Sequence, residues 1–186
     1  PFISAHQKTQ SPPEMTGNSG SLAVRIRLMT LADIDAVLRI ERASFPTPWP
    51  RDAFLYELAR PDRSICRVAE RPQADQAPKI IGDIVVWLAG SIAHVATLAV
   101  HPEYRRRGIG ACLLANVLLA CADRGLTEAL LEVREENHSA QKLYRKFGFE
   151  VVGIRPKYYA DTGEDAVLMG LKPLAPDQLA EFVKCG

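Results

Sequence analysis

Apolar and polar residues follow two different periods along this chain, and the changes of period divide it into strands and helices. Short runs that are apolar, or that alternate with polar residues, predict strands at 24–28, 64–70, 79–88, 92–100, 127–133, 149–154 and 166–171. Apolar residues three and four positions apart predict helices at 30–43, 51–59, 109–124 and 137–147. The strands between 64 and 100 follow one another without a helix, which predicts an antiparallel meander. Strand and helix alternate after it, so the pattern predicts an α/β domain.

The two ends of the chain lack this periodicity. Residues 1–22 are polar and rich in Ser, Pro and Gly, which predicts a disordered N-terminal tail. We expect the folded domain to span 23–175 and a C-terminal extension to cover 176–186.

Charge and composition exclude several classes of protein. Lys and Arg number 23 against 22 Asp and Glu, so the net charge of +1 gives no general basic field for direct nucleic-acid binding. The apolar runs are interrupted well before the ~20 residues of a membrane span, and no secretion signal is recognisable. We therefore expect a soluble, cytoplasmic protein with no membrane partner. The four cysteines lack the paired spacing of metal ligands, which argues against a bound metal and against disulfides.

The stretch from 92 to 111 combines a buried strand with an anion-binding turn. Its first nine residues, I-A-H-V-A-T-L-A-V, are mostly apolar, and R-R-R-G-I-G-A at 105–111 leads into a predicted helix. Glycines at a helix start let a ligand approach the backbone N–H groups, and the arginines add positive charge. Neither the dinucleotide fingerprint nor the nucleoside triphosphate loop fits this spacing, so we expect another pyrophosphate ligand. An arginine-rich turn that only caps a core helix is the alternative.

A proline-rich loop, S-F-P-T-P-W-P at 44–50, joins the first two predicted helices. The prolines stiffen it and hold Phe45, Pro46 and Trp49 in place. From the residues alone, this loop is either a hydrophobic plug against the core or one wall of a substrate site.

Three further residues are candidates for chemistry. Glu132 lies among apolar neighbours in A-L-L-E-V, where burial is expected to raise the carboxyl pKa toward the range of a general base. The same pattern fits a half-exposed strand residue. Tyr144 and His94 also have a plain interpretation, as core residues whose polar atoms are satisfied.

Two motifs resemble those of a known family. V-x-P-E-Y-R-R-R-G-I-G-A, at 100–111, resembles the acyl-coenzyme A signature Q/R-x-x-G-x-G/A of the GNAT superfamily of N-acetyltransferases. L-E-V-R-x-x-N, followed by a helix with L-Y-x-x-x-G-F, resembles the RimI branch, which acetylates the N-terminal alanine of a ribosomal protein. The resemblance covers about 24–171. It implies acetyl-CoA as cosubstrate and the GNAT fold: a mixed, mostly antiparallel sheet, splayed at its central strand and flanked by about four helices.

The resemblance also implies roles for the candidate residues. Glu132 matches the general base, and Tyr144 matches the acid that protonates the departing thiolate in a direct transfer. His94 matches a histidine that assists catalysis in archaeal-type N-terminal acetyltransferases. Whether Glu132 or His94 accepts the proton therefore stays open.

Substrate and cofactor contacts follow in the same way. Phe45 and Pro46 match a pair that holds the first residues of the acceptor peptide, with Trp49 beside them, and Tyr158 and Tyr159 match paired tyrosines on the opposite side. The residues implied for coenzyme A binding are Leu98, Ala99, Val100, Arg105, Arg106, Arg107, Gly108, Ile109, Gly110, Ala111, Asn137 and Tyr144.

The sequence departs from the RimI pattern in its long polar N-terminus and in His101, where Asp is usual. His94 and the segment Y-Y-A-D-T-G-E-D favour broader, archaeal-type specificity. We therefore expect an N-terminal protein acetyltransferase whose partner is a protein N-terminus, with the N-terminal alanine of a ribosomal protein as the first candidate and a broad, archaeal-type range as an alternative. A small-amine acetyltransferase and a coenzyme A sensor are the alternatives, and the presence of both Glu132 and Tyr144 argues against the sensor. The oligomeric state is not predicted.

Overall fold

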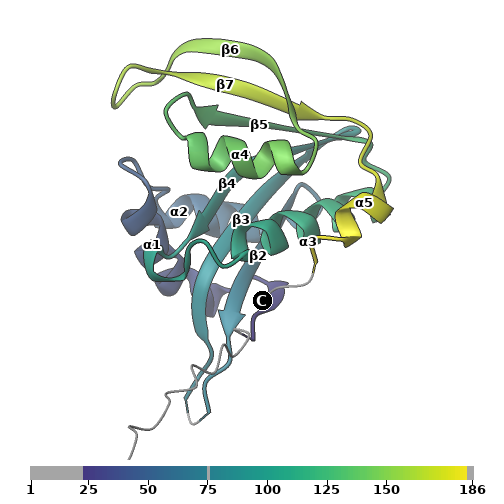
Figure 1. Ribbon diagram of the computed structural model, residues 1–186. Helices are drawn as coiled ribbons and strands as arrows, with labels where there is room; N and C mark the ends of the chain where they lie inside the picture. The colour runs from purple at the N-terminus through teal and green to yellow at the C-terminus, as the bar shows by residue number, and fades with distance from the viewer. Residues whose placement is uncertain (1–22, 75, 184–186) are drawn as a thin grey trace, which may run out of the picture.

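A seven-stranded sheet forms the centre of the molecule, in the order β1-β2-β3-β4-β5-β7-β6 (Figure 1). The computed structural model describes residues 23–74 and 76–183, and the tail expected at 1–22 lies outside them. The strands are β1 (Arg25–Leu28), β2 (Ser64–Arg71), β3 (Lys79–Ala89), β4 (Ile92–Val100), β5 (Glu128–Arg134), β6 (Glu150–Tyr159) and β7 (Glu164–Leu171). The helices are α1 (Ile34–Ser44), α2 (Arg51–Leu58), α3 (Ile109–Asp123), α4 (His138–Lys146) and α5 (Pro176–Ala180), with 3-10 turns η1 (Leu31–Asp33) and η2 (Pro102–Tyr104).

The sheet forks between β4 and β5. These two strands are parallel, whereas every other pair of neighbours is antiparallel, and their ladder ends at the pair Val95 and Leu131. Beyond this point β5 stays paired with β7 as far as Arg134. A β-bulge at Ala96, opposite the step from Val85 to Val86, turns β4 away at the same place. The predicted mixed sheet that splays at its central strand is therefore confirmed.

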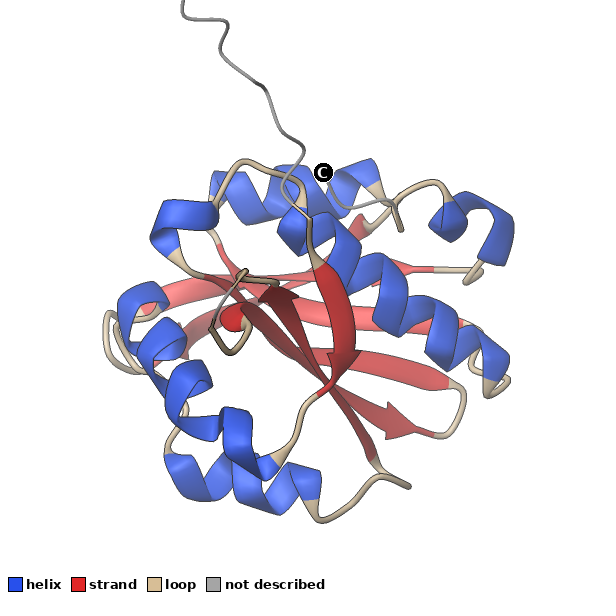
Figure 2. Cartoon of the chain, turned by 90° about the horizontal axis from the view of Figure 1, so that it is seen from below, coloured by secondary structure: helices blue, strands red, loops and turns tan. Residues whose placement is uncertain are grey.

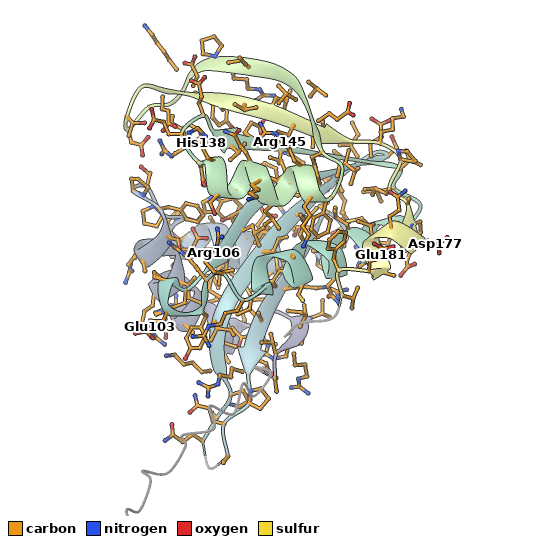
Figure 3. All side chains as sticks on the ribbon, viewed as in Figure 1. Glu103, Arg106, His138, Arg145, Asp177 and Glu181 are labelled. Carbon is orange, nitrogen blue, oxygen red and sulfur yellow. The ribbon has the colours of Figure 1, made fainter. Side chains whose placement is uncertain are left out.

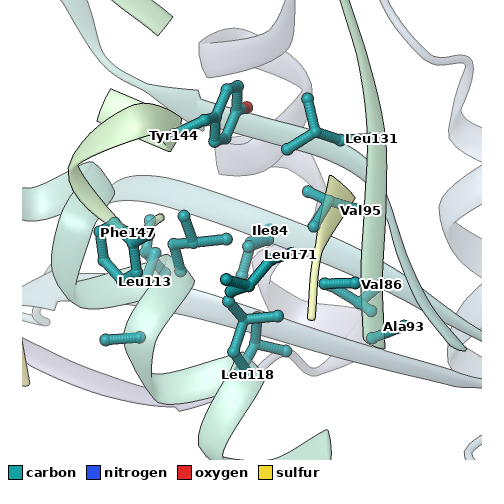
Figure 4. Packing of buried hydrophobic residues seen from close by; sticks show 14 of the residues in the cluster. Ile84, Val86, Ala93, Val95, Leu113, Leu118, Leu131, Tyr144, Phe147 and Leu171 are labelled. Carbon is teal, nitrogen blue, oxygen red and sulfur yellow. The ribbon is translucent and has the colours of Figure 1, made fainter. Parts of the chain in front are cut away.

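Two hydrophobic clusters hold the helices on opposite faces of the sheet (Figure 2). Side chains alternate along β3, so that Ile84 joins the cluster under α3 while Val85 joins the cluster under α1 and α2. The larger cluster also contains Tyr144 of α4 and Phe147, the residue that follows α4 (Figure 4). In Figure 1, α4 is drawn between β5 and β4, the two strands that separate at the fork. The fork is thus fixed from both faces.

The segment at 155–165, predicted as a loop, is largely strand. β6 runs to Tyr159, although its pairing with β7 is irregular between Arg155 and Tyr159. Lys157 has a φ of 52°, and its N–H donates to Asp165 Oδ1 over 2.7 Å. This irregular backbone, in a polar sequence with a proline, removes the alternation by which a strand is recognised.

The C-terminal extension contains the short helix α5, which the sequence did not predict. Its Leu179 is 2% exposed and packs into the larger cluster. Cys66 and Cys121 are buried free thiols, but Cys112 is disulfide-bonded, so the expectation of no disulfide is wrong at that position. Within the described part of the chain, no helix has the length and apolar character needed to cross a bilayer.

Candidate active site

Two cavities meet at the fork of the sheet, and each has a volume of about 560 Å³. The loop-side cavity lies between the α1–α2 loop, the forked strands and the β6–β7 turn. The helix-side cavity lies between the end of β4, the loop at 105–108 and helices α3 and α4. The residues that line both cavities are Ser44, Phe45, Leu98, Asn137, Ala140 and Tyr144.

The N-terminus of α3 opens into the helix-side cavity. Gly108 is its N-cap with a φ of 78°, a left-handed conformation that side chains disfavour. The backbone N–H of Cys112 is the first to bond inside the helix, to Gly108 O over 3.0 Å. The preceding N–H groups, from Ile109 to Ala111, therefore remain available to an anion, and these residues line the cavity. The space around Gly108 is open, since a Cβ there would lie more than 4 Å from every described residue beyond its own turn, and this suits the close approach of a phosphate.

The three arginines at 105–107 have different positions. Arg106, labelled in Figure 3, lines the helix-side cavity. Arg105 also lines it, but its guanidinium donates to Val100 O over 2.9 Å and to Ser44 Oγ over 3.0 Å. Arg107 does not line the cavity and lies over the ring of Tyr104, 5.8 Å from its centroid.

Lysines that the sequence analysis did not single out complete the charge of this cavity. Lys142 and Lys146 of α4 line it together with Arg105 and Arg106. Lys142 and Lys146 are four positions apart and therefore lie on the same face of α4. The sequence could have indicated them only if the face of α4 that meets α3 had been known. A cavity with this much positive charge suits a diphosphate.

The end of β4 contributes backbone donors between the two cavities. The N–H of His101 bonds to Ile81 O on β3, so by strand alternation the N–H groups of Leu98 and Val100 point the other way. Because β5 has already separated from β4, these two N–H groups face the fork. They are therefore placed to polarise a carbonyl oxygen there.

Glu132 is the first residue of β5 beyond the fork, and its side chain is 7% exposed. His94 Nε2 lies 2.6 Å from Glu132 Oε2. An ionised carboxylate has no proton to give, so the imidazole N–H is the donor in that state. On the other side, Arg155 Nη1 lies 3.1 Å from Glu132 Oε1 as an ion-pair contact without hydrogen-bond alignment. Glu132 lines the loop-side cavity, and His94, which does not line it, contacts this carboxylate from behind.

Tyr144 and Asn137 stand where the two cavities meet. Burial raises the pKa of Tyr144 far above that of a free phenol, with a smaller effect from Tyr159, so its hydroxyl keeps its proton. Asn137 is the N-cap of α4, and its Oδ1 accepts from the N–H of Ala140 over 3.1 Å. Tyr144 is thus a proton donor within reach of both cavities.

Two walls face each other across the loop-side cavity. Phe45, Pro46 and Trp49 form one, and Tyr158 and Tyr159 form the other. The rings of the two tyrosines meet edge to face, with centroids 5.2 Å apart. The sequence predicted these residues as the two sides of one acceptor site, and the fold brings them to one cavity.

Residues that the sequence analysis missed link the two walls. Thr47 Oγ1 donates to Asp161 Oδ2 over 2.8 Å, and Arg134 holds the same carboxylate from β5 at 2.7 Å. Arg134 also lies over the ring of Tyr159, 3.9 Å from its centroid. Thr47 and Asp161 are 114 positions apart in the chain, so no local pattern could pair them.

Two cavities that meet at a fork, one lined with positive charge and one with a buried carboxylate, suit a protein that brings two substrates together. The comparison with protein families specifies which group is transferred. The model of the Acetyltransferase (GNAT) family matches residues 34–149, and the chain belongs to this family of acetyltransferases, which use acetyl-CoA.

Several relatives resemble the chain over most of its length. It is 38% identical over 144 residues, 77% of this chain and 92% of the other, to a Bacillus subtilis protein provisionally named ribosomal protein bS18-alanine N-acetyltransferase. It is 35% identical to an N-alpha-acetyltransferase of Sulfolobus acidocaldarius, over 78% of this chain and 90% of the other. The crystal structure of the ribosomal-protein-S18-alanine N-acetyltransferase from Escherichia coli superposes with a TM-score of 0.71 at 28% identity, covering 81% of this chain and 94% of that one.

Proposed function

We propose that this acetyltransferase transfers the acetyl group of acetyl-CoA to the α-amine of a protein N-terminus, and that the N-terminal alanine of a ribosomal protein is an acceptor. The relatives named for this reaction support the acceptor class. The observation that carries the proposal is the contact of 2.6 Å between His94 Nε2 and Glu132 Oε2, because Glu132 lines a cavity with two aromatic walls.

The helix-side cavity would hold the coenzyme A diphosphate. The N–H groups from Ile109 to Ala111 and the side chains of Arg106, Lys142 and Lys146 supply its donors and positive charge. Leu98 and Val100 then direct their N–H groups at the thioester carbonyl. Arg105 supports this site indirectly, because its guanidinium donates hydrogen bonds to Val100 O and Ser44 Oγ and so holds the end of β4 against the end of α1.

The base has a defined task in this reaction. An α-ammonium group has a pKa near ~8 and cannot attack a carbonyl until it loses a proton. Glu132 and His94 accept that proton, the amine nitrogen bonds to the thioester carbon, and the carbon–sulfur bond breaks. Tyr144 protonates the departing sulfur, and the second proton lost by nitrogen as it becomes an amide replaces the one that Tyr144 gave. No acyl-enzyme is formed, so both substrates must be bound together.

The first alternative is a broader acceptor range, in which the enzyme acetylates many different protein N-termini as archaeal-type N-alpha-acetyltransferases do. The pairing of His94 with Glu132 favours it, because the sequence resemblance links such a histidine to the broader enzymes. A small amine as acceptor is the remaining enzymatic alternative, and a coenzyme A sensor without turnover is the non-enzymatic one. The cytoplasmic location and the division at 23–175 are also part of this proposal.

Mass spectrometry of acetylated peptides tests the function. Peptides that differ only in their first residue, beginning with alanine, are incubated with acetyl-CoA beside polyamines and aminoglycosides, with Glu132→Gln as the inactive control. We expect mass gain at the peptide α-amine, and the range of accepted first residues separates the narrow from the broad activity. Acetylation of small amines alone would reject the peptide acceptor, and ping-pong initial-rate kinetics would reject direct transfer. Binding of acetyl-CoA without any turnover would indicate a sensor.

A further inference from the structure

A buried carboxyl group joins three elements on the floor of the loop-side cavity. Glu41, near the end of α1, is 0% exposed and lines this cavity. Its Oε1 accepts from Thr97 Oγ1 on β4 over 2.9 Å, and its Oε2 accepts from the backbone N–H of Trp49 over 3.2 Å. No ion pair reaches Glu41 from the described residues. Burying a carboxyl without a cation is unfavourable, so its two hydrogen bonds are the reason to look for a specific role.

The two bonds fix the loop and the strand that form the cavity. Trp49 is the last aromatic residue of the proline-rich loop, and Thr97 directly follows the bulge at Ala96 that turns β4 at the fork. Glu41 therefore sets the distance between the loop wall and the backbone of β4. Without it, the loop would be held on this side mainly by ring packing.

Ring contacts lead from Trp49 to the proposed base. Trp49 stacks on Trp87 of β3 with centroids 6.0 Å apart and an interplanar angle of 24°. Trp87 in turn packs against the imidazole of His94, 5.4 Å away, and His94 bonds to Glu132. A shift of the Trp49 backbone would consequently displace a stack that ends at the imidazole.

We infer that Glu41 is a positioning residue for the acceptor: through Trp49 and Thr97 it holds the loop wall where a substrate amine meets Glu132 and His94. This inference rests on the proposed function. The two cavities provide the discriminating feature, because Glu41, Trp49 and Thr97 all line the loop-side cavity and none of them lines the helix-side cavity. A residue that only stabilises the fold would not separate acceptor from donor in this way.

The choice of variants follows from the bonds. Glu41→Ala removes both acceptors. Glu41→Gln keeps both contacts, because its amide oxygen can accept from the N–H of Trp49 while its NH₂ group donates to the Thr97 hydroxyl. Thr97→Val removes only the bond to β4 and keeps the shape of the side chain. Glu70→Ala is the matched control, since Glu70 is also buried, at 2% exposed, but pairs with Arg25 and Arg27 at the far edge of the sheet.

Steady-state kinetics with a peptide acceptor, together with calorimetry of acetyl-CoA binding, test the inference. We expect Glu41→Ala to lower kcat/KM for the peptide by ~100-fold, the scale of a displacement of about 1 Å, while the Kd for acetyl-CoA changes less than about twofold. Glu41→Gln should restore kcat/KM to within about threefold of the unmodified protein, and Thr97→Val should lose about tenfold. Glu70→Ala should change neither quantity beyond its effect on folding.

Tryptophan spectroscopy gives a readout that does not depend on the acceptor. The chain has two tryptophans, and both belong to the stack. Glu41→Ala should shift their emission and remove the near-ultraviolet circular dichroism of the pair, whereas Glu70→Ala should not. Unchanged kcat/KM and spectra in Glu41→Ala would overturn the inference, as would equal losses of acetyl-CoA affinity and peptide turnover. If Glu41→Ala does not fold, an unaltered Thr97→Val overturns it. If the unmodified protein acetylates no peptide while Glu41→Ala still disrupts the stack, the proposed acceptor is wrong, and only the role of Glu41 in holding the loop wall stands.

Discussion

His94 Nε2 and Glu132 Oε2 are 2.6 Å apart, although the two residues come from different strands and are 38 positions apart. The contact exists because β4 and β5 are parallel neighbours up to Val95 and Leu131 and then separate, which leaves Glu132 free to turn toward the imidazole. The sequence left open which residue accepts the substrate proton. The short contact supports the proposal that the carboxylate and the imidazole act as one unit.

Removing the carboxylate charge tests that unit. Glu132→Gln should lower kcat by ~10²- to 10⁴-fold, the usual range for loss of a general base. His94→Ala should lower it by ~10- to 100-fold, because the hydrogen bond from the imidazole to a charged group is lost while the carboxylate remains. Since the two act together, the double variant should be little worse than Glu132→Gln in single-turnover assays. Multiplicative losses in the double variant would mean that the two residues act independently.

Glu128→Gln is the control for this pair. Glu128 is also on β5, at the opposite end, and its carboxylate pairs with Lys172 at 2.5 Å in a more exposed position. Loss of such a surface pair has little effect, so kcat should stay within about twofold. A comparable loss of kcat in Glu128→Gln would show that any change of charge on β5 disturbs the enzyme.

Loss of the Tyr144 hydroxyl should slow the departure of the thiolate. Tyr144→Phe is expected to lower kcat by ~10²-fold or more, with little change in stability, because the hydroxyl has no hydrogen-bond partner in the described structure and the ring packing is kept. Burial raises the pKa of Tyr144, so its hydroxyl stays protonated below pH ~10. The pH profile of kcat should therefore show no fall from this group below that pH. The pH profile of kcat and the melting temperature of both proteins are the measurements. A thioester with a more acidic leaving thiol should be less affected, and an equal loss with it would exclude the acid role.

The fold could be predicted wherever one period dominates. The central strand was predicted at 92–100, its observed bounds, because its apolar run ends at Pro102. The segment after 154 was not, because the strand there is polar and irregular. The short helix α5 was missed for a related reason: its few residues carry no periodic signal.

The site was predictable only in the parts that lie within one motif. The turn at 105–111 shows its chemistry locally, in glycines and arginines. Glu41 had a visible signal, a glutamate on the apolar face of a helix, but its partners Trp49 and Thr97 are defined by tertiary packing. The link from Thr47 to Asp161 joins two loops that only the folded sheet brings together, and Arg155 lay in a segment predicted as loop.

Two glycines of the helix-side cavity should respond differently to alanine. Gly108 has a φ of 78°, so Gly108→Ala should lower the free energy of unfolding by ~1–2 kcal/mol and weaken acetyl-CoA binding by about tenfold as the N–H groups turn. At Gly110 a new Cβ would lie 3.4 Å from Leu143 Cδ2 and 3.7 Å from Val100 Cγ2, which are tolerable contacts. Gly110→Ala should therefore bind nearly as the unmodified protein does. Calorimetry and urea unfolding on both variants decide, and an unchanged Kd in Gly108→Ala would remove the anion role of this turn.

Asp83 predicts how stability changes with pH. It is 0% exposed on β3, neither carboxyl oxygen has a hydrogen-bond partner among the described residues, and burial, with a further effect from Glu41, raises its pKa well above the usual range. Between pH ~4, where an unfolded Asp loses its proton, and the raised pKa, the folded state binds more protons, so stability falls as pH rises. Asp83→Asn does not titrate, and its melting temperature should exceed that of the unmodified protein by a margin that grows from pH 5 to pH 9. Each kcal/mol gained corresponds to ~2–4 °C for a chain of this size.

Asp33→Asn should change stability with pH in the opposite direction to Asp83→Asn. Its hydrogen bond with Arg27, at 2.7 Å, lowers the pKa of Asp33, so the stabilisation is present at neutral pH and is lost as pH falls through the folded-state pKa. Asp33→Asn should consequently destabilise most at pH 7 and least at pH 3, while Asp83→Asn gains most at high pH. Thermal unfolding across this range compares the two. A margin for Asp83→Asn that stays constant from pH 5 to pH 9 would show that Asp83 is already ionised in the folded protein at pH 5.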